Sequence, residues 1–243
     1  MSETAVSRRG LLIPALTTLV IVAVLLSLGF WQLERRGDKL ALIATLDERL
    51  AAQPVALPPP AEWGALSPQK DEFRRVTFTG AADQANAGRV FTSVTPLRKD
   101  VTGTGVWLFA PVKLASGETV VVNFGFVPEG QSVPQAASQS AMLTGYIRFA
   151  EPQNWLTPAA DTGRKLWFVR DHQGMAQTLG WGRVAPFYID LESPVPPGGV
   201  PKPGPLQVNL KNDHMQYAIT WFLLAFAVVV AFGFWFQGHR RRA

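Results

Sequence analysis

The sequence predicts an α+β membrane protein in which two terminal transmembrane helices flank an antiparallel, β-rich extracytoplasmic domain. Two uncharged stretches of 20 residues, Leu11–Phe30 and Tyr217–Phe236, lie near opposite ends of the chain. Each is long enough for roughly 30 Å of helix, about the thickness of the hydrocarbon core of a bilayer. Between them lie short β-branched and aromatic runs separated by turn residues. Such runs are typical of an antiparallel sheet or a partly closed barrel.

The first uncharged stretch is predicted to be an uncleaved membrane anchor. Ser7-Arg8-Arg9 before it resembles a twin-arginine signal. However, the apolar run exceeds the roughly 7–15 residues of a signal peptide, and Phe30-Trp31-Gln32 follows it in place of a small-x-small cleavage site. No arginine- and serine-rich transit peptide precedes it, which favours the plasma (inner) membrane of a bacterium.

The placement of cations predicts the orientation in the membrane. Arg240–Arg242 hold the C-terminus in the cytoplasm by the positive-inside rule, and two spans then place the N-terminus there with Arg8 and Arg9. Arg35, Arg36 and Lys39 oppose this orientation, but long domains translocate largely regardless of charge. The predicted boundaries are a cytoplasmic tail at 1–10, a first transmembrane helix at 11–33, the periplasmic β-rich domain at 34–213, a second transmembrane helix at 214–236 and a basic cytoplasmic tail at 237–243.

The interval between the spans changes from helical to strand-like periodicity. Gly37–Ala52 has leucine and isoleucine at helical spacing and predicts an amphipathic helix, and the proline-rich Pro54–Pro60 ends it. A second proline- and glycine-rich linker, Pro194–Pro205, precedes the second span. The predicted strands are Phe73–Thr79, Arg89–Val94, Val106–Leu114, Thr119–Val127, Leu143–Phe149, Leu166–Arg170 and Phe187–Leu191, with a short helix at His172–Leu179 and a loop at Glu129–Ser140.

Charge and composition exclude several function classes. Residues 34–216 carry 18 lysines and arginines against 17 acidic residues, a net charge of only +1, so the basic balance lies in the tails and does not indicate nucleic-acid binding. The chain has no cysteine, hence no disulfide and no thiolate chemistry. The sequence has no glycine-rich phosphate loop, nucleophile elbow or histidine–carboxylate set at metal-site spacing. We therefore expect no enzymatic activity.

The outer ends of the two spans carry the candidate site. His214, Tyr217 and Trp221 share one face of the second helix by their spacing. Trp31, Arg35 and Arg36 lie at the same depth on the first span. An imidazole for iron, aromatic rings for a macrocycle and guanidinium groups for propionates are the side chains that a haem requires. The same residues also suit an aromatic belt with snorkelling cations, and the residues alone leave both interpretations open.

Four motifs resemble the Surfeit locus protein 1 family, in family order and between two terminal spans. The resemblance extends from about Gly29 to Phe236. The motifs are Gly29-Phe30-Trp31-Gln32 followed by Arg35 and Lys39, then Val122-Asn123-Phe124-Gly125-Phe126-Val127-Pro128, Ala185-Pro186-Phe187-Tyr188-Ile189-Asp190, and Asn212-Asp213-His214-Met215-Gln216-Tyr217-Ala218-Ile219-Thr220-Trp221-Phe222.

The resemblance implies an assembly factor for haem–copper cytochrome c oxidase that binds haem a transiently at the outer membrane face. His214 matches the family's candidate iron ligand, and the implied partners are oxidase subunit I and haem a synthase. A cofactor-free scaffold that holds oxidase subunits is the alternative. Two positions depart from the family pattern. Phe124 stands where an arginine is usual, and Asp213 where a second asparagine is usual.

Overall fold

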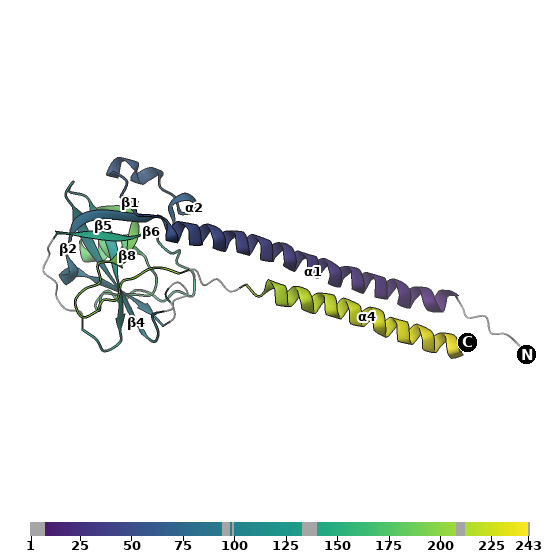
Figure 1. Cartoon of the computed structure of the whole chain (residues 1–243). Coiled ribbons are helices and arrows are strands. Elements are labelled where there is room, and N and C mark those ends of the chain that lie inside the picture. Colours follow the sequence, from purple (N-terminus) through teal and green to yellow (C-terminus); the bar gives the residue numbers. More distant parts are fainter. Residues whose placement is uncertain (1–7, 94–97, 99, 133–139, 208–211, 243) are drawn as a thin grey trace, which may run out of the picture. The chain divides into compact units, whose positions relative to one another are not determined.

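The computed structural model describes residues 8–93, 98, 100–132, 140–207 and 212–242 of the chain. The chain divides into two compact units, of which the first comprises Met1–Ala44 with Leu210–Ala243 and the second Thr45–Asn209. The first unit contains two long helices, and the second contains the strands (Figure 1). Predicted features at 1–7, at Val94 and at 133–139 lie outside the described residues.

Helices α1 (Arg8–Ala51) and α4 (His214–Arg242) are long and apolar enough to cross a membrane, which agrees with the predicted pair of terminal transmembrane helices. The predicted span and the predicted amphipathic helix at Gly37–Ala52 form one continuous helix. No proline separates them, and a single glycine such as Gly37 is tolerated inside a helix at a cost of about 1 kcal/mol. The helix ends before Gln53, whose helical conformation Pro54 disfavours.

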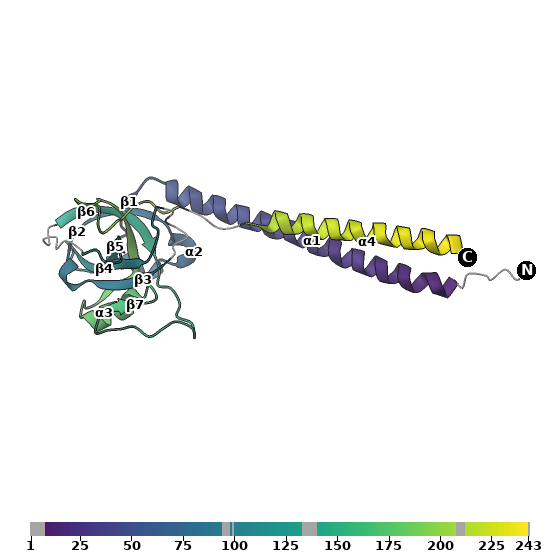
Figure 2. The same ribbon diagram turned by 90° about the horizontal axis from the view of Figure 1, so that it is seen from below.

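The two helices of the first unit contact each other through small and aromatic residues (Figures 1 and 2). A Cβ atom at Gly29 would lie 2.4 Å from the ring of Phe222, so only glycine permits this approach. The Phe222 ring also meets Phe30 edge-on, with ring centroids 5.4 Å apart. Ala218 and Ala225 are buried on α4. Small residues that allow close approach are the usual means by which helices pair in lipid.

The strands of the second unit form one mixed sheet that closes on itself. Pairing of β2 with β4 closes five strands into a barrel in the order β2-β6-β8-β5-β4, and β1, β3 and β7 extend the sheet beyond it. The described elements of this unit are β1 (Val55–Ala56), η1 (Pro60–Ala65), α2 (Pro68–Asp71), β2 (Arg75–Ala82), η2 (Gln84–Asn86), β3 (Gly88–Thr92), β4 (Gly105–Leu114), β5 (Thr119–Pro128), β6 (Ser140–Arg148), β7 (Leu166–Trp167), α3 (His172–Leu179) and β8 (Val184–Ser193).

The predicted partly closed barrel is confirmed, with one addition. The barrel is antiparallel except between β5 and β8, which run parallel with Val122 opposite Ile189. A parallel pair requires a long crossover connection, and the chain provides one through β6, β7 and α3. The pairing partner of a strand depends on tertiary packing, so the sequence pattern of β5 and β8 did not specify it.

Alternation along the strands divides the core into two clusters. Leu108, Val122 and Ile189 belong to a cluster to which all five barrel strands contribute, which places it in the barrel interior. Their neighbours Phe109, Val121 and Tyr188 point to the opposite face, because successive side chains of a strand alternate. This outer cluster packs against α3, β3 and β7, which lie together on one side of the barrel (Figure 2).

His172, the first residue of α3, is fully buried beside the outer cluster. Its Nε2 lies 3.1 Å from the carbonyl oxygen of Ala185, and its ring centroid is 5.5 Å from that of Tyr188. A carbonyl oxygen only accepts, so Nε2 carries the proton. Nδ1 has no hydrogen-bond partner among the described residues. Burial lowers the pKa of His172 below its usual 6.5, because the charged form loses its hydration.

We expect the free energy of unfolding to fall as the pH drops below about 6.5, because the unfolded chain then binds a proton that folded His172 does not. The loss approaches about 1.4 kcal/mol per pH unit until the lowered pKa of the folded state is reached. The measurement is urea unfolding of the full chain in detergent between about pH 5 and pH 7. His172→Gln keeps a donor for Ala185, and an unchanged pH slope in this variant would contradict the assignment.

Candidate functional site

His214 is the first residue of α4, and its side chain contacts α1. Its Nδ1 lies 2.8 Å from Oε1 of Gln32, and both side chains are partly buried. This hydrogen bond continues the contact that Gly29 and Phe30 make with Phe222. The first turn of α4 therefore meets α1 at Gln32, part-way along that helix, where the topology prediction places the outer end of the first span.

The predicted site residues of α1 lie within about one helical turn of Gln32 along the helix. Trp31 is 48% exposed. Arg35 and Arg36 follow one helical turn after Gln32 and are exposed. In the described part of the chain neither guanidinium forms an ion pair. Both cations are thus available to an anionic group at this site.

The predicted site residues of α4 do not all share one environment. His214 and Trp221 are partly buried, whereas Tyr217 is 56% exposed. The buried face of the helix instead includes Ala218. Tyr217 therefore lies at the margin of the helix contact, where its ring is accessible.

The residue that the sequence analysis missed is Gln32. It is the last residue of the Gly29–Gln32 motif. The sequence feature that could have identified Gln32 is a neutral polar side chain within an apolar and aromatic segment, at the predicted depth of the histidine on the other span. Polar side chains in such positions are usually functional or hydrogen-bonded to a neighbouring helix.

The side chains where α4 meets α1, hereafter the mouth, fit a haem by their chemistry. The contact with Gln32 occupies Nδ1 of His214 and leaves Nε2 available. The rings of Trp31 and Tyr217 on the same two helices are exposed. Arg35 and Arg36, which form no ion pair among the described residues, follow Gln32 by one helical turn. Among the residues that the structure describes, no group of three or more histidine, aspartate or glutamate side chains could hold a metal ion. His214 is the residue of this site that would hold the iron.

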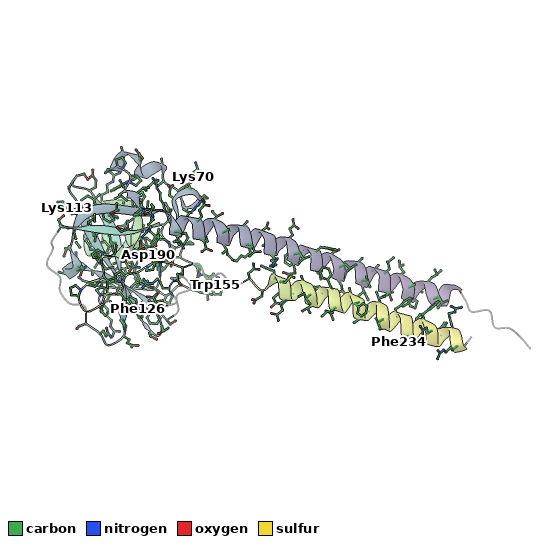
Figure 3. The ribbon with its side chains drawn as sticks, in the orientation of Figure 1. Lys70, Lys113, Phe126, Trp155, Asp190 and Phe234 are labelled. Carbon is green, nitrogen blue, oxygen red and sulfur yellow. The ribbon has the colours of Figure 1, made fainter. Side chains whose placement is uncertain are left out.

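A second polar cluster, which the sequence did not predict, lies on the sheet face opposite the barrel interior, because its strand residues alternate with interior ones. Figure 3 labels its central residue, Asp190. Asp190 on β8 is its centre. It accepts hydrogen bonds from Asn123 Nδ2 at 2.6 Å and from Arg148 Nη1 at 2.8 Å, and Arg170 Nη1 lies 3.5 Å away. Arg148 also donates to Glu72 at 2.6 Å. These residues come from five separate segments of the second unit and tie them together.

Burial shifts the pKa values of Glu72 and of Tyr188, whose hydroxyl lies 3.5 Å from Arg170 Nη1. Loss of hydration raises the pKa of Glu72, although the neighbouring guanidinium opposes the shift. Burial likewise raises the pKa of Tyr188, next to Arg148 and Arg170, to about 12. The four charged side chains Glu72, Arg148, Arg170 and Asp190 balance one another, so this cluster stabilises the fold. We do not assign it a catalytic role.

The motif around Asn123 is explained by this cluster and by close backbone packing. Asn123 Oδ1 accepts from the amide of Gly125 at 3.1 Å. Gly125 has a φ of +120°, and a Cβ there would lie 2.3 Å from the backbone of Lys202. Phe124, at the position where the resemblance implies an arginine, is 7% exposed and packs in the barrel interior.

These features define a class of membrane protein with two candidate spans, a β-barrel domain between them and a histidine at the meeting point of the spans. Comparison with known proteins gives the family. The SURF1 family model matches residues 19–226, and the chain belongs to this family. The family is known for assembly factors of cytochrome c oxidase that are not enzymes. Family membership thus confirms the prediction that the chain is not an enzyme.

Individual relatives match over most of their length. Surfeit locus protein 1 of Rattus norvegicus is 34% identical over 241 residues, which cover 92% of this chain and 75% of the rat protein. Surfeit locus protein 1 of Homo sapiens is 33% identical over 228 residues, covering 86% and 73%. A SURF1-like protein of Monosiga brevicollis is 34% identical over 220 residues, covering 85% and 81%.

Proposed function

We propose that this chain binds haem a transiently at the mouth formed by α1 and α4 and helps to insert it into subunit I of cytochrome c oxidase. The observation that carries the proposal is the contact between His214 and Gln32. It joins the first turn of α4 to the part of α1 that carries Trp31, Arg35 and Arg36. Membership of an oxidase-assembly family supports the same conclusion.

Each side chain has a distinct role in this proposal. Nε2 of His214 binds the haem iron. Trp31, Tyr217 and Trp221 form the apolar wall against the macrocycle, and of their rings those of Trp31 and Tyr217 are exposed while that of Trp221 is partly buried. Arg35 or Arg36 pairs with a propionate, since a guanidinium binds a carboxylate through two parallel hydrogen bonds.

The geometry suits a carrier that must release its cargo. A single imidazole ligand and partly exposed aromatic walls hold a haem less firmly than a closed pocket with two axial ligands. Haem a is cargo in this scheme, received from haem a synthase and delivered to subunit I. The chain itself supplies binding, orientation and charge compensation.

The proposed topology places both tails in the cytoplasm and the β-rich domain of residues 34–213 on the periplasmic side of a bacterial plasma membrane. Arg240 and Arg241 follow the apolar part of α4, as the positive-inside rule requires for a cytoplasmic end. The proposed haem site then lies at the outer face, and along the chain its residues flank the β-rich domain.

The test is purification of the full chain from membranes that also make haem a, followed by an absorption spectrum. We expect bound haem in the wild-type chain and at least a tenfold loss in His214→Ala, because the axial ligand is removed. His239→Ala is the matched control, since His239 lies at the opposite end of α4 and stacks on Trp235. An unchanged spectrum in His214→Ala would overturn the ligand assignment.

The same preparation distinguishes the proposed haem carrier from the alternative, a cofactor-free scaffold. A scaffold retains subunit I in a pull-down whether or not His214 is present, and its wild-type form carries no haem. A haem carrier loses its spectrum in His214→Ala while the barrel domain stays folded.

A further inference from the structure

The hydrogen bond between the two spans determines which nitrogen of His214 can bind a metal. Oε1 of Gln32 lies 2.8 Å from Nδ1, and an amide oxygen can only accept a hydrogen bond. Nδ1 must therefore carry the proton, which leaves the lone pair on Nε2. We propose that Gln32 is a positioning residue that fixes His214 in the Nδ1-protonated form and presents Nε2 to the iron. This inference rests on the proposed haem-binding function.

The helix contact holds Gln32 in place for this role. Gly29, one turn before Gln32, and Phe30 are packed against Phe222, which lies two turns after His214. The contact therefore fixes both the depth and the rotation of α1 relative to α4 at the site. Since both side chains are partly buried, water competes weakly for Nδ1 and the hydrogen bond is stronger than at a fully exposed position.

The chemistry of the acceptor also bears on release of the cargo. Partners of a metal-binding histidine are commonly carboxylates, carbonyl groups or water, and a more basic acceptor makes the imidazole a stronger ligand. A neutral amide orients the ring without adding the strength of a charge-assisted hydrogen bond. Gln32 thus provides orientation together with a moderate iron bond, as transfer of the haem requires. Gln32→Glu should keep the orientation and strengthen the bond.

The first experiment observes the proton itself and needs no haem. The full chain is labelled with ¹⁵N-histidine and studied by NMR in lipid nanodiscs, where its three histidines give separable signals that His172→Gln and His239→Gln assign. We expect His214 to be protonated on Nδ1. Gln32→Leu should shift the ratio of the two tautomers by about two- to tenfold, the equivalent of one net hydrogen bond. Gln216→Leu, an exposed glutamine-to-leucine change in the first turn of α4, should leave it unchanged.

Two results would overturn the inference. One is an Nε2-protonated His214 in the wild-type chain, which would mean that the amide nitrogen of Gln32 donates to Nδ1. The other is a tautomer ratio that Gln32→Leu does not alter.

The second experiment titrates ferric protoporphyrin IX into the same variants. We expect about 10- to 100-fold weaker binding in Gln32→Leu and binding at least as tight as wild type in Gln32→Glu. If His214→Ala also binds normally, the proposed function fails whatever the NMR result. If His214→Ala loses the haem but Gln32→Leu does not, only the role of Gln32 is wrong.

Discussion

Replacing Asp190 with alanine is expected to destabilise the barrel domain by about 3–5 kcal/mol, the usual cost of removing one partner from a buried ion pair. Asp190 is 4% exposed and is the shared acceptor of Arg148 and Asn123. Without it, the ion pairs that remain to these two cations among the described residues are Arg148 with Glu72 and Arg170 with Glu151 at 3.7 Å. The measurement is urea unfolding of the full chain in detergent, followed by near-ultraviolet circular dichroism.

Asp161→Ala is the matched control for this prediction. Asp161 pairs with Arg164 at 3.6 Å and accepts from the Arg164 amide at 3.0 Å, and both side chains are exposed at the surface. An exposed ion pair contributes about 0–1 kcal/mol, so this variant should unfold close to the wild-type urea concentration. If the two alanine variants unfolded at the same concentration, the buried cluster would not have the stabilising role that we assign to it.

Replacing Gly29 with leucine should separate the two spans. A Cβ there would overlap the Phe222 ring, and Phe30 on the other side of that ring restricts its movement. Overpacking of this kind costs about 1–3 kcal/mol, which corresponds to a roughly 5- to 150-fold fall in the ratio of paired to separated helices. Because the chain has no cysteine, the Gln32→Cys/His214→Cys pair can report helix pairing by crosslinking in membranes without background.

Gly37→Leu is the control. Gly37 lies on the same helix as Gly29, but a Cβ added there would meet nothing within 4 Å. Both substitutions raise the helix propensity of α1 equally, so local propensity cannot explain a difference between them. Equal crosslinking of the two variants would contradict a close approach at Gly29. In chains that keep Gln32 and His214, Gly29→Leu should also weaken the haem spectrum, since the candidate site needs both helices.

Much of the fold was predictable from the sequence. The run Thr119–Val127 became β5 with an extension of one residue, and His172–Leu179 became α3 without change. Alternation of apolar residues and turn residues controls such local structure, so the pattern identifies it. The closure of the barrel through β2 and β4 and the parallel pair of β5 and β8 depend on contacts between distant segments. No local pattern encodes them.

Only part of the candidate site was predictable, because it too depends on contacts between distant segments. His214 is apparent as an ionisable residue at the boundary of a span, and the resemblance marks the same position. The role of Gln32 required knowing which face of α1 meets α4. Asp190 and Arg148 lie on strand positions opposite the barrel interior, where a polar residue ordinarily faces water. Only the segments that cover them, which include Glu72 and Arg170, make them buried.

Closure of the barrel also limits how this protein can recognise a partner. Once β2 pairs with β4, the ends of the described sheet are β1 and β7, each of two residues. An unassembled subunit with exposed backbone amides therefore finds almost no strand on which to add itself. If the protein works during oxidase assembly, as we propose, its barrel is thereby protected from strand addition by incompletely folded chains. Its selectivity must then come from side-chain surfaces.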